Sequence, residues 1–148
     1  MSKPESAVEV IGPAAGERVD VLGAPVLLKS GGDPRHMTFA DHPLPAGYGV
    51  PMHLHEDEDE LFYILEGELT VTTEAGEMVA GPGSFVHLPR GCPHAFRNAS
   101  GRDGRMIVVA SPGGGLDGVF RGLDAARGEP LGPGRVAEIV RPHGVRLL

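Results

Sequence analysis

Short apolar runs alternate along this chain with turns that are rich in Gly and Pro. The runs that predict β-strands span residues 8–11, 20–28, 36–40, 50–55, 61–65, 69–73, 77–80, 85–88, 95–98 and 105–111. Between them lie turn sequences such as EGE and EAGE, in which Gly supplies the positive φ of a tight hairpin. Regularly spaced short strands of this kind are typical of a β-sandwich or barrel. The pattern therefore predicts an all-β fold.

After residue 112 the apolar residues follow a helical spacing instead. Two short helices are predicted there, the first from Leu116, Val119, Phe120 and Leu123 and the second from Val136, Ile139 and Val140. Each set lies on one face of a helix at this spacing. We expect one domain over residues 1–148, with a loosely ordered arm over 1–20, a barrel over 30–111 and a C-terminal helical extension over 112–148.

Composition limits the cellular setting. The chain has 148 residues, enough to bury a core without disulfides, and its single cysteine, Cys92, has no partner in the chain. A lone cysteine suits a reducing compartment. We see no secretory signal at the N-terminus and no apolar stretch of the roughly 18 residues that a membrane span needs. We therefore expect a soluble, cytoplasmic protein.

Charge is unevenly distributed around a formal net charge of −7. Residues 41–77 hold ten acids and no Lys or Arg, whereas the Arg residues after position 78 are spaced singly. Phosphate backbones require clustered Lys and Arg, so the pattern argues against nucleic acid as a partner. We expect a small-molecule partner instead, and a homodimer, because small β-barrels of this kind often cover a sheet face or edge with a second copy.

Two histidines suggest metal chemistry. His53 and His55 are two residues apart, so on a strand they share one face and can bind one ion. A third histidine, His94, opens another expected strand after the turn PRGCP, and carboxylates follow His55 directly. Three imidazoles and one carboxylate suit a divalent first-row ion such as Fe, Mn, Ni, Co, Cu or Zn, and this donor set does not choose among them.

Five consecutive acids follow His55, and Glu60 is the one expected to join the histidines. It starts an apolar strand on whose one face it lies with Phe62 and Ile64, whereas residues 56–59 are expected to form a solvated loop. Since the histidines have odd numbers and Glu60 an even one, the loop must reset the strand phase. On this interpretation Glu60→Ala impairs metal binding, and Asp57→Ala or Glu58→Ala has little effect.

The histidines and Glu60 belong to two longer patterns. Residues 47–67 read G-x5-H-x-H-x4-E-x6-G, and residues 83–98 read G-x5-P-x-G-x2-H-x3-N, with fifteen residues between them. The chain resembles the small single-domain cupins, whose two motifs these are, and is similar to their flavonol (quercetin) dioxygenase-like group. The resemblance implies a double-stranded β-helix, or jelly roll, and the metal ligands His53, His55, Glu60 and His94. It further implies a metal-dependent dioxygenase in which Glu60 is also the catalytic base.

Alternatives remain beside this interpretation. The same ligand set serves non-redox isomerases, cyclases or lyases, and some cupin barrels only bind small molecules. Phe62 and Phe96 point inward with the ligands and are either plain core or substrate-binding residues. His87 is expected to face away from the interior, and Cys92 to be a buried turn residue. The three remaining histidines are expected on the surface: His36, His42 and His143.

Overall fold

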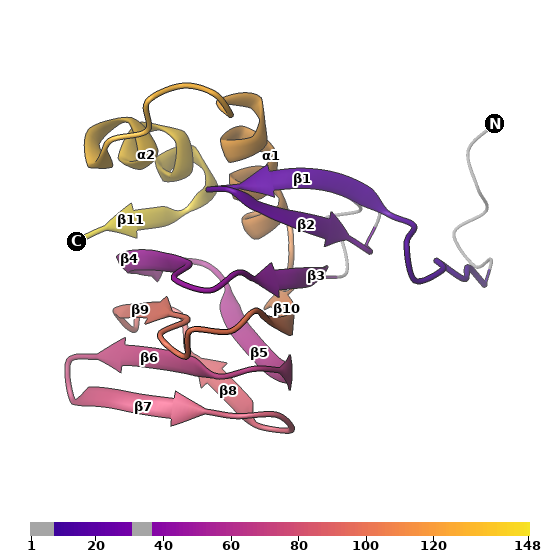
Figure 1. Cartoon of the computed structure of the whole chain (residues 1–148). Helices are drawn as coiled ribbons and strands as arrows, with labels where there is room; N and C mark the ends of the chain where they lie inside the picture. The colour runs from indigo at the N-terminus through magenta and orange to yellow at the C-terminus, as the bar shows by residue number, and fades with distance from the viewer. Residues whose placement is uncertain (1–7, 31–36) are drawn as a thin grey trace, which may run out of the picture.

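Two antiparallel β-sheets enclose the core in the structure, a computed structural model that describes residues 8–30 and 37–148 (Figure 1). The six-stranded sheet has β1 (Glu17–Val21), β2 (Ala24–Leu28), β3 (Thr38–Leu44), β10 (Gly104–Ser111), β5 (Asp59–Glu66) and β8 (Phe85–Leu88), in that order. The five-stranded sheet has β11 (Val145–Leu147), β4 (Gly49–His55), β9 (His94–Arg97), β6 (Leu69–Thr73) and β7 (Gly76–Ala80). The all-β jelly-roll expectation is confirmed.

Alternation of apolar and polar residues determines which side chains enter the core. On β5, Phe62 and Ile64 are buried, whereas Tyr63 between them is 46% exposed. Strand β5 pairs with β10 on one side and with β8 on the other. One face of this central strand therefore supplies the interior with apolar side chains and with Glu60.

The two predicted helices are present and close one end of the barrel. Helix α1 spans Leu116–Ala125, α2 spans Pro133–Val140, and a short 3-10 helix, η1, follows at Arg141–His143. All four apolar residues that predicted α1 are buried, as are Val136 and Val140 of α2. Helix α1 packs on β1, and α2 packs on α1 and β11, so both lie at the same end of the molecule in Figure 1.

Several expected elements differ from those observed. No strand forms over residues 8–11, and the run 20–28 is divided by a turn at Leu22 and Gly23, both with positive φ. Strand β1 already begins at Glu17, so the sheet includes part of the expected arm. The run 36–40 begins outside the described residues and continues as β3 to Leu44.

Strand β11 was not predicted. Its three residues are too few to show an alternating pattern, and they follow Gly144, which ends η1 with a φ of +80°. It pairs with the end of β4, Val145 opposite His55 and Leu147 opposite His53. The C-terminus is therefore tied to the strand that carries two of the expected metal ligands. Among the described residues, no helix is long and apolar enough to cross a membrane.

Candidate metal centre

Three strands bring the four sequence-predicted ligands together. His53 and His55 lie on β4, Glu60 on β5 and His94 on β9, and His53 stands opposite His94 in the β4–β9 pairing. One potential ligand atom from each residue lies within 4.8 Å of those of the other three. All four side chains are at most 6% exposed. We call this group the His/Glu cluster.

The phase change before Glu60 takes place as expected, although the connection is shorter. Strand β4 ends at His55 and β5 begins at Asp59, so only residues 56–58 connect them. Glu60 is 4% exposed and shares the inward face with Phe62 and Ile64. The carboxylate therefore reaches the histidines from the opposite sheet, so strands of both sheets contribute to the cluster.

Backbone carbonyls orient two of the imidazoles. Nδ1 of His53 lies 2.7 Å from the carbonyl oxygen of Pro51, and Nδ1 of His94 lies 3.0 Å from that of Cys92. A carbonyl only accepts, so each Nδ1 carries a hydrogen and donates a hydrogen bond to it, and in the neutral ring Nε2 then bears a lone pair. Fixing the tautomer in this way is how proteins prepare histidine ligands for a metal.

Unpaired polar atoms inside the cluster fit a cation. Nε2 of His55 and Nε2 of His94 each lie 3.4 Å from a carboxylate oxygen of Glu60. Four atoms of the cluster are therefore buried without a hydrogen-bond partner among the described residues: Nε2 of His55, Nε2 of His94, Nδ1 of His55 and Oε1 of Glu60. Leaving buried polar atoms unsatisfied costs about 1–3 kcal/mol each, which an ion shared among them would offset. The donor set therefore suits a divalent first-row ion.

Electrostatics favour the protonation state that a ligand needs at His53 and Glu60, whereas His94 must lose a proton to bind an ion. Burial, and the neighbouring His94, lower the pKa of His53 to about 4, so its imidazole is neutral at pH 7. Burial alone would raise the pKa of Glu60, but His55, His94 and His53 outweigh it and lower this pKa to about 2. Burial opposes protonation of His94 as well, yet the negative charge of the nearby Glu60 outweighs burial and raises the pKa of His94.

Comparison with known proteins agrees with this geometry. A family model described as the Cupin domain matches residues 42–110, a span that contains both motifs and all four cluster residues.

The chain is a cupin.

The proteins that this cupin resembles are named for different functions. It is 38% identical to the quercetin 2,3-dioxygenase of Bacillus subtilis over 69 residues, which are 47% of this chain but only 20% of that enzyme. It is 29% identical to an oxalate-binding protein of Thermotoga maritima over 101 residues, 68% of this chain and 84% of that protein. The polyketide cyclase RemF of Streptomyces resistomycificus superposes with a TM-score of 0.59 at 23% identity, covering 70% of this chain and 79% of that one. At this identity the likeness shows the fold.

An apolar cavity leads from the cluster toward the helices of this cupin. Its walls come from both sheets, both helices and β11, and its polar lining residues are His42, Tyr48, His53, His55 and Glu60. Phe62 and Phe96 line it as well, with their rings edge to face at 5.2 Å. Both phenylalanines are nearly fully buried, so they are core residues and cavity walls at once.

The structure corrects the expectation for His42. This residue was expected on the surface, but it is 2% exposed and lines the cavity. No motif indicated it, since it stands in TFADHPL, where only the pairing of β3 with β10 turns it inward. His143 is half-buried, and His36 lies outside the described residues. His87 is exposed, as expected, and Cys92 is half-buried in its turn.

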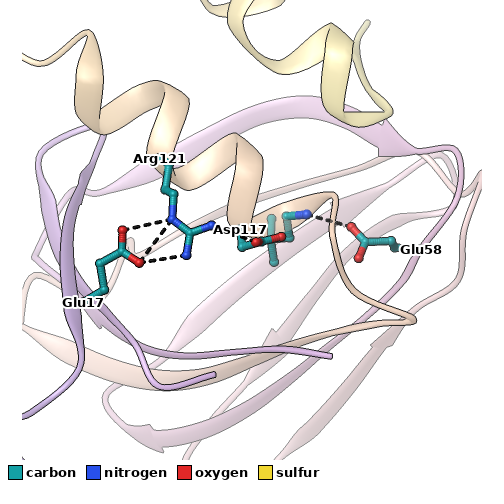
Figure 2. A network of polar contacts seen from close by, with 5 residues as sticks. Glu17, Glu58, Asp117 and Arg121 are labelled. Carbon is teal, nitrogen blue, oxygen red and sulfur yellow. Dashed lines mark hydrogen bonds and ion pairs between the residues drawn. The ribbon is translucent and has the colours of Figure 1, made fainter. Parts of the chain in front are cut away.

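The acidic loop before Glu60 is not fully solvated as predicted, because Glu58 is buried. It is 4% exposed, and its carboxylate accepts hydrogen bonds from the backbone N–H of Gly113 at 3.0 Å and of Leu116 at 2.7 Å. Figure 2 shows this carboxylate at the beginning of α1. A carboxylate there pairs backbone donors that the first turn of a helix leaves free. Sequence alone gave no signal, because the partners lie more than fifty residues away.

Further contacts attach the C-terminal extension around the cavity. Arg146 of β11 forms an ion pair with Glu56 at 2.8 Å, and the backbone N–H of Glu56 donates to the carbonyl of Gly144. On the other side, Arg121 of α1 binds Glu17 of β1 and Asp117 of its own helix (Figure 2). Glu56 and Glu58 therefore attach the C-terminal extension that covers the cavity, and Glu60 alone of the five acids joins the cluster.

Proposed function

We propose that this cupin is a metal-dependent dioxygenase that acts on a small aromatic or enolic substrate, of which flavonols are the model class. The observation that carries the proposal is the position of the His/Glu cluster at the wall of an apolar cavity lined by aromatic rings. The walls of this cavity are mainly apolar, so they favour apolar substrate groups and keep water from the reacting atoms. The partial likeness to a quercetin 2,3-dioxygenase supports the same class.

We propose distinct tasks for the residues of the cluster. His53, His55, Glu60 and His94 hold one divalent first-row ion, which would lower the pKa of a substrate hydroxyl and bring substrate and dioxygen together. Glu60, ionised above about pH 2, accepts the proton of that hydroxyl through Oε1, which has no hydrogen-bond partner. Phe62 and Phe96 hold the substrate ring by edge and face contacts.

The test is reconstitution without oxygen. Metal-free protein is loaded with Fe, Mn, Ni, Co, Cu or Zn under nitrogen, and oxygen uptake is then measured on a panel of flavonols and catechols. We expect metal-dependent uptake of one dioxygen per substrate, lost in Glu60→Ala and kept in Asp57→Ala, whose side chain is exposed. Absence of uptake with every metal would contradict the proposal.

Two other outcomes identify the alternatives. Conversion of a substrate under nitrogen would mean a non-redox isomerase, cyclase or lyase, because only such chemistry proceeds without dioxygen. Tight binding of a panel compound with no turnover under either gas would mean a small-molecule-binding cupin. The oxalate-binding relative makes this second outcome worth a direct measurement, so oxalate belongs in the panel.

We also propose a cytoplasmic homodimer, as the sequence predicts. Light scattering at micromolar protein concentration measures the mass directly, and the chain of 15.5 kDa would give twice that value. A monomer mass would refute the dimer. Fractionation of cells that express the chain tests the location.

A further inference from the structure

Among the described residues that line the cavity, only His42 and Tyr48 have an ionisable side chain and lie outside the His/Glu cluster. The ring centroid of His42 lies 5.5 Å from that of Tyr48, 6.2 Å from that of Phe120 and 6.5 Å from that of Phe96, each with edge-to-face geometry. Aromatic rings therefore hold the imidazole in one orientation.

The hydrogen bond of the ring determines its tautomer. Nδ1 lies 2.6 Å from the carbonyl oxygen of Pro43, which can only accept, so Nδ1 carries the hydrogen. Nε2 then bears a lone pair, and no described residue donates to it. Burial lowers the pKa of His42, which keeps the ring neutral. The cavity thus contains an acceptor without a donor.

The other polar group on this wall is already engaged. The hydroxyl of Tyr48 donates to the carbonyl oxygen of Val21 at 2.7 Å, so its hydrogen is not available to His42 or to a ligand. The remaining wall between His42 and the cluster is apolar, with Phe62 and Val108 on it. A ligand that fills this space meets two side-chain acceptors there, Nε2 of His42 and the hydroxyl oxygen of Tyr48.

His42 and Glu60 are well separated in the sheet. They lie on β3 and β5 with β10 between them, His42 opposite Met106 and Glu60 opposite Ala110. Two strand spacings across and four residues along place the two backbone positions on the order of 15 Å apart. Both side chains line the cavity, and Glu60 is near enough to act electrostatically on the His42 ring, so a ligand held at the cluster can also reach His42.

We infer that His42 Nε2 accepts a hydrogen bond from a hydroxyl or N–H group on the substrate, away from the atoms that bind the metal. The inference rests on the proposed function, which it sharpens: the substrate is a mainly apolar molecule with metal-binding oxygens and, separate from them, a hydrogen-bond donor. An analogue without that donor would leave Nε2 of His42 unpaired. It should bind more weakly, because the nitrogen loses contact with water and gains no hydrogen bond in return.

The test compares two probes on zinc-loaded protein, since zinc does not oxidise diols. Isothermal titration measures binding of 2,3-dihydroxynaphthalene and of 2,3,6-trihydroxynaphthalene, which adds a hydroxyl on the far ring. Wild type should prefer the triol by roughly 10-fold, the value of one buried hydrogen bond. The preference should vanish in His42→Phe, which keeps an aromatic ring, and return in part in His42→Gln, which restores an acceptor oxygen.

The outcomes separate this inference from the proposed function. Equal binding of both probes by wild type overturns the role of His42 while leaving the metal site intact, and this measurement needs no variant to fold. An unchanged preference in His42→Phe also overturns it. Failure of the zinc-loaded protein to bind either diol more tightly than the zinc-free protein overturns the proposed function as well. Zinc affinity of His42→Phe should equal that of wild type, because His42 is not a member of the cluster.

Discussion

Replacing Glu58 by Ala should destabilise the protein even though the residue lies in a run of five acids. The substitution removes the acceptor of two backbone N–H groups at the beginning of α1. The N–H of Leu116 is buried, so leaving it unpaired costs about 1–3 kcal/mol. The N–H of Gly113 is partly buried and can find water, and its loss resembles that of a helix cap, about 1 kcal/mol.

Together these terms predict a loss of about 2–4 kcal/mol in the free energy of unfolding. For a chain of this length that corresponds to a decrease in Tm of roughly 5–15 °C. Urea unfolding followed by circular dichroism measures the free energy, and hydrogen exchange over α1 reports whether the helix detaches before the barrel unfolds. Exchange in α1 should increase more than exchange in β5 or β10.

Two control variants make the measurement decisive. Asp57→Ala removes an exposed acid from the same loop and should change stability by less than about 0.5 kcal/mol. Glu58→Gln keeps one acceptor oxygen, so it can pair with one of the two N–H groups and should fall between wild type and Glu58→Ala. If Glu58→Ala and Asp57→Ala prove equally stable, Glu58 does not anchor the helix and the reasoning is wrong.

Three further predictions concern the cluster and one turn. Glu60→Ala should weaken zinc binding at least 10-fold by titration, with Asp57→Ala as the unchanged control, because only Glu60 supplies a buried oxygen to the group. Zinc binding at pH 6.5 should release more than about half a proton from His94, whose pKa lies above its usual 6.5, and this contribution should disappear as pH rises through the raised pKa. Calorimetric titration in two buffers of different ionisation enthalpy measures the number of protons released. If that number does not fall between pH 6.5 and pH 9, the prediction is wrong. Gly67→Ala should cost about 1–3 kcal/mol in urea unfolding, because Gly67 has a φ of +78° and an added Cβ would lie 2.8 Å from Gly104 Cα, whereas Gly81→Ala, with open space around it, should be tolerated.

The grouping of the His/Glu cluster could largely be predicted from local sequence. A spacing of two puts His53 and His55 on one strand face, and the apolar strand after Glu60 fixes which acid turns inward. The motif around His94 supplied the fourth ligand without any knowledge of its position in space. These inferences succeed because each depends on neighbours within a few residues along one strand.

The remaining features depend on contacts between distant segments. Glu58 and Asp57 are adjacent acids that sequence cannot tell apart, and only the arrival of α1 over the cavity buries one of them. His42 showed no pattern, and the pairing of β3 with β10 decided that it faces the cavity. Strand β11 forms because β4 offers an open edge, since three residues have no strand preference of their own.

The sequence by itself therefore determined the fold class and the identity of the four cluster residues, because periodicity and turn chemistry are local properties. Tertiary structure alone decided what surrounds them: Glu56 and Glu58 attach the C-terminal extension, this extension covers an apolar cavity, and His42 lines that cavity. The physical reason is that burial and hydrogen-bond partnership arise from segments more than fifty residues apart, which no local pattern records.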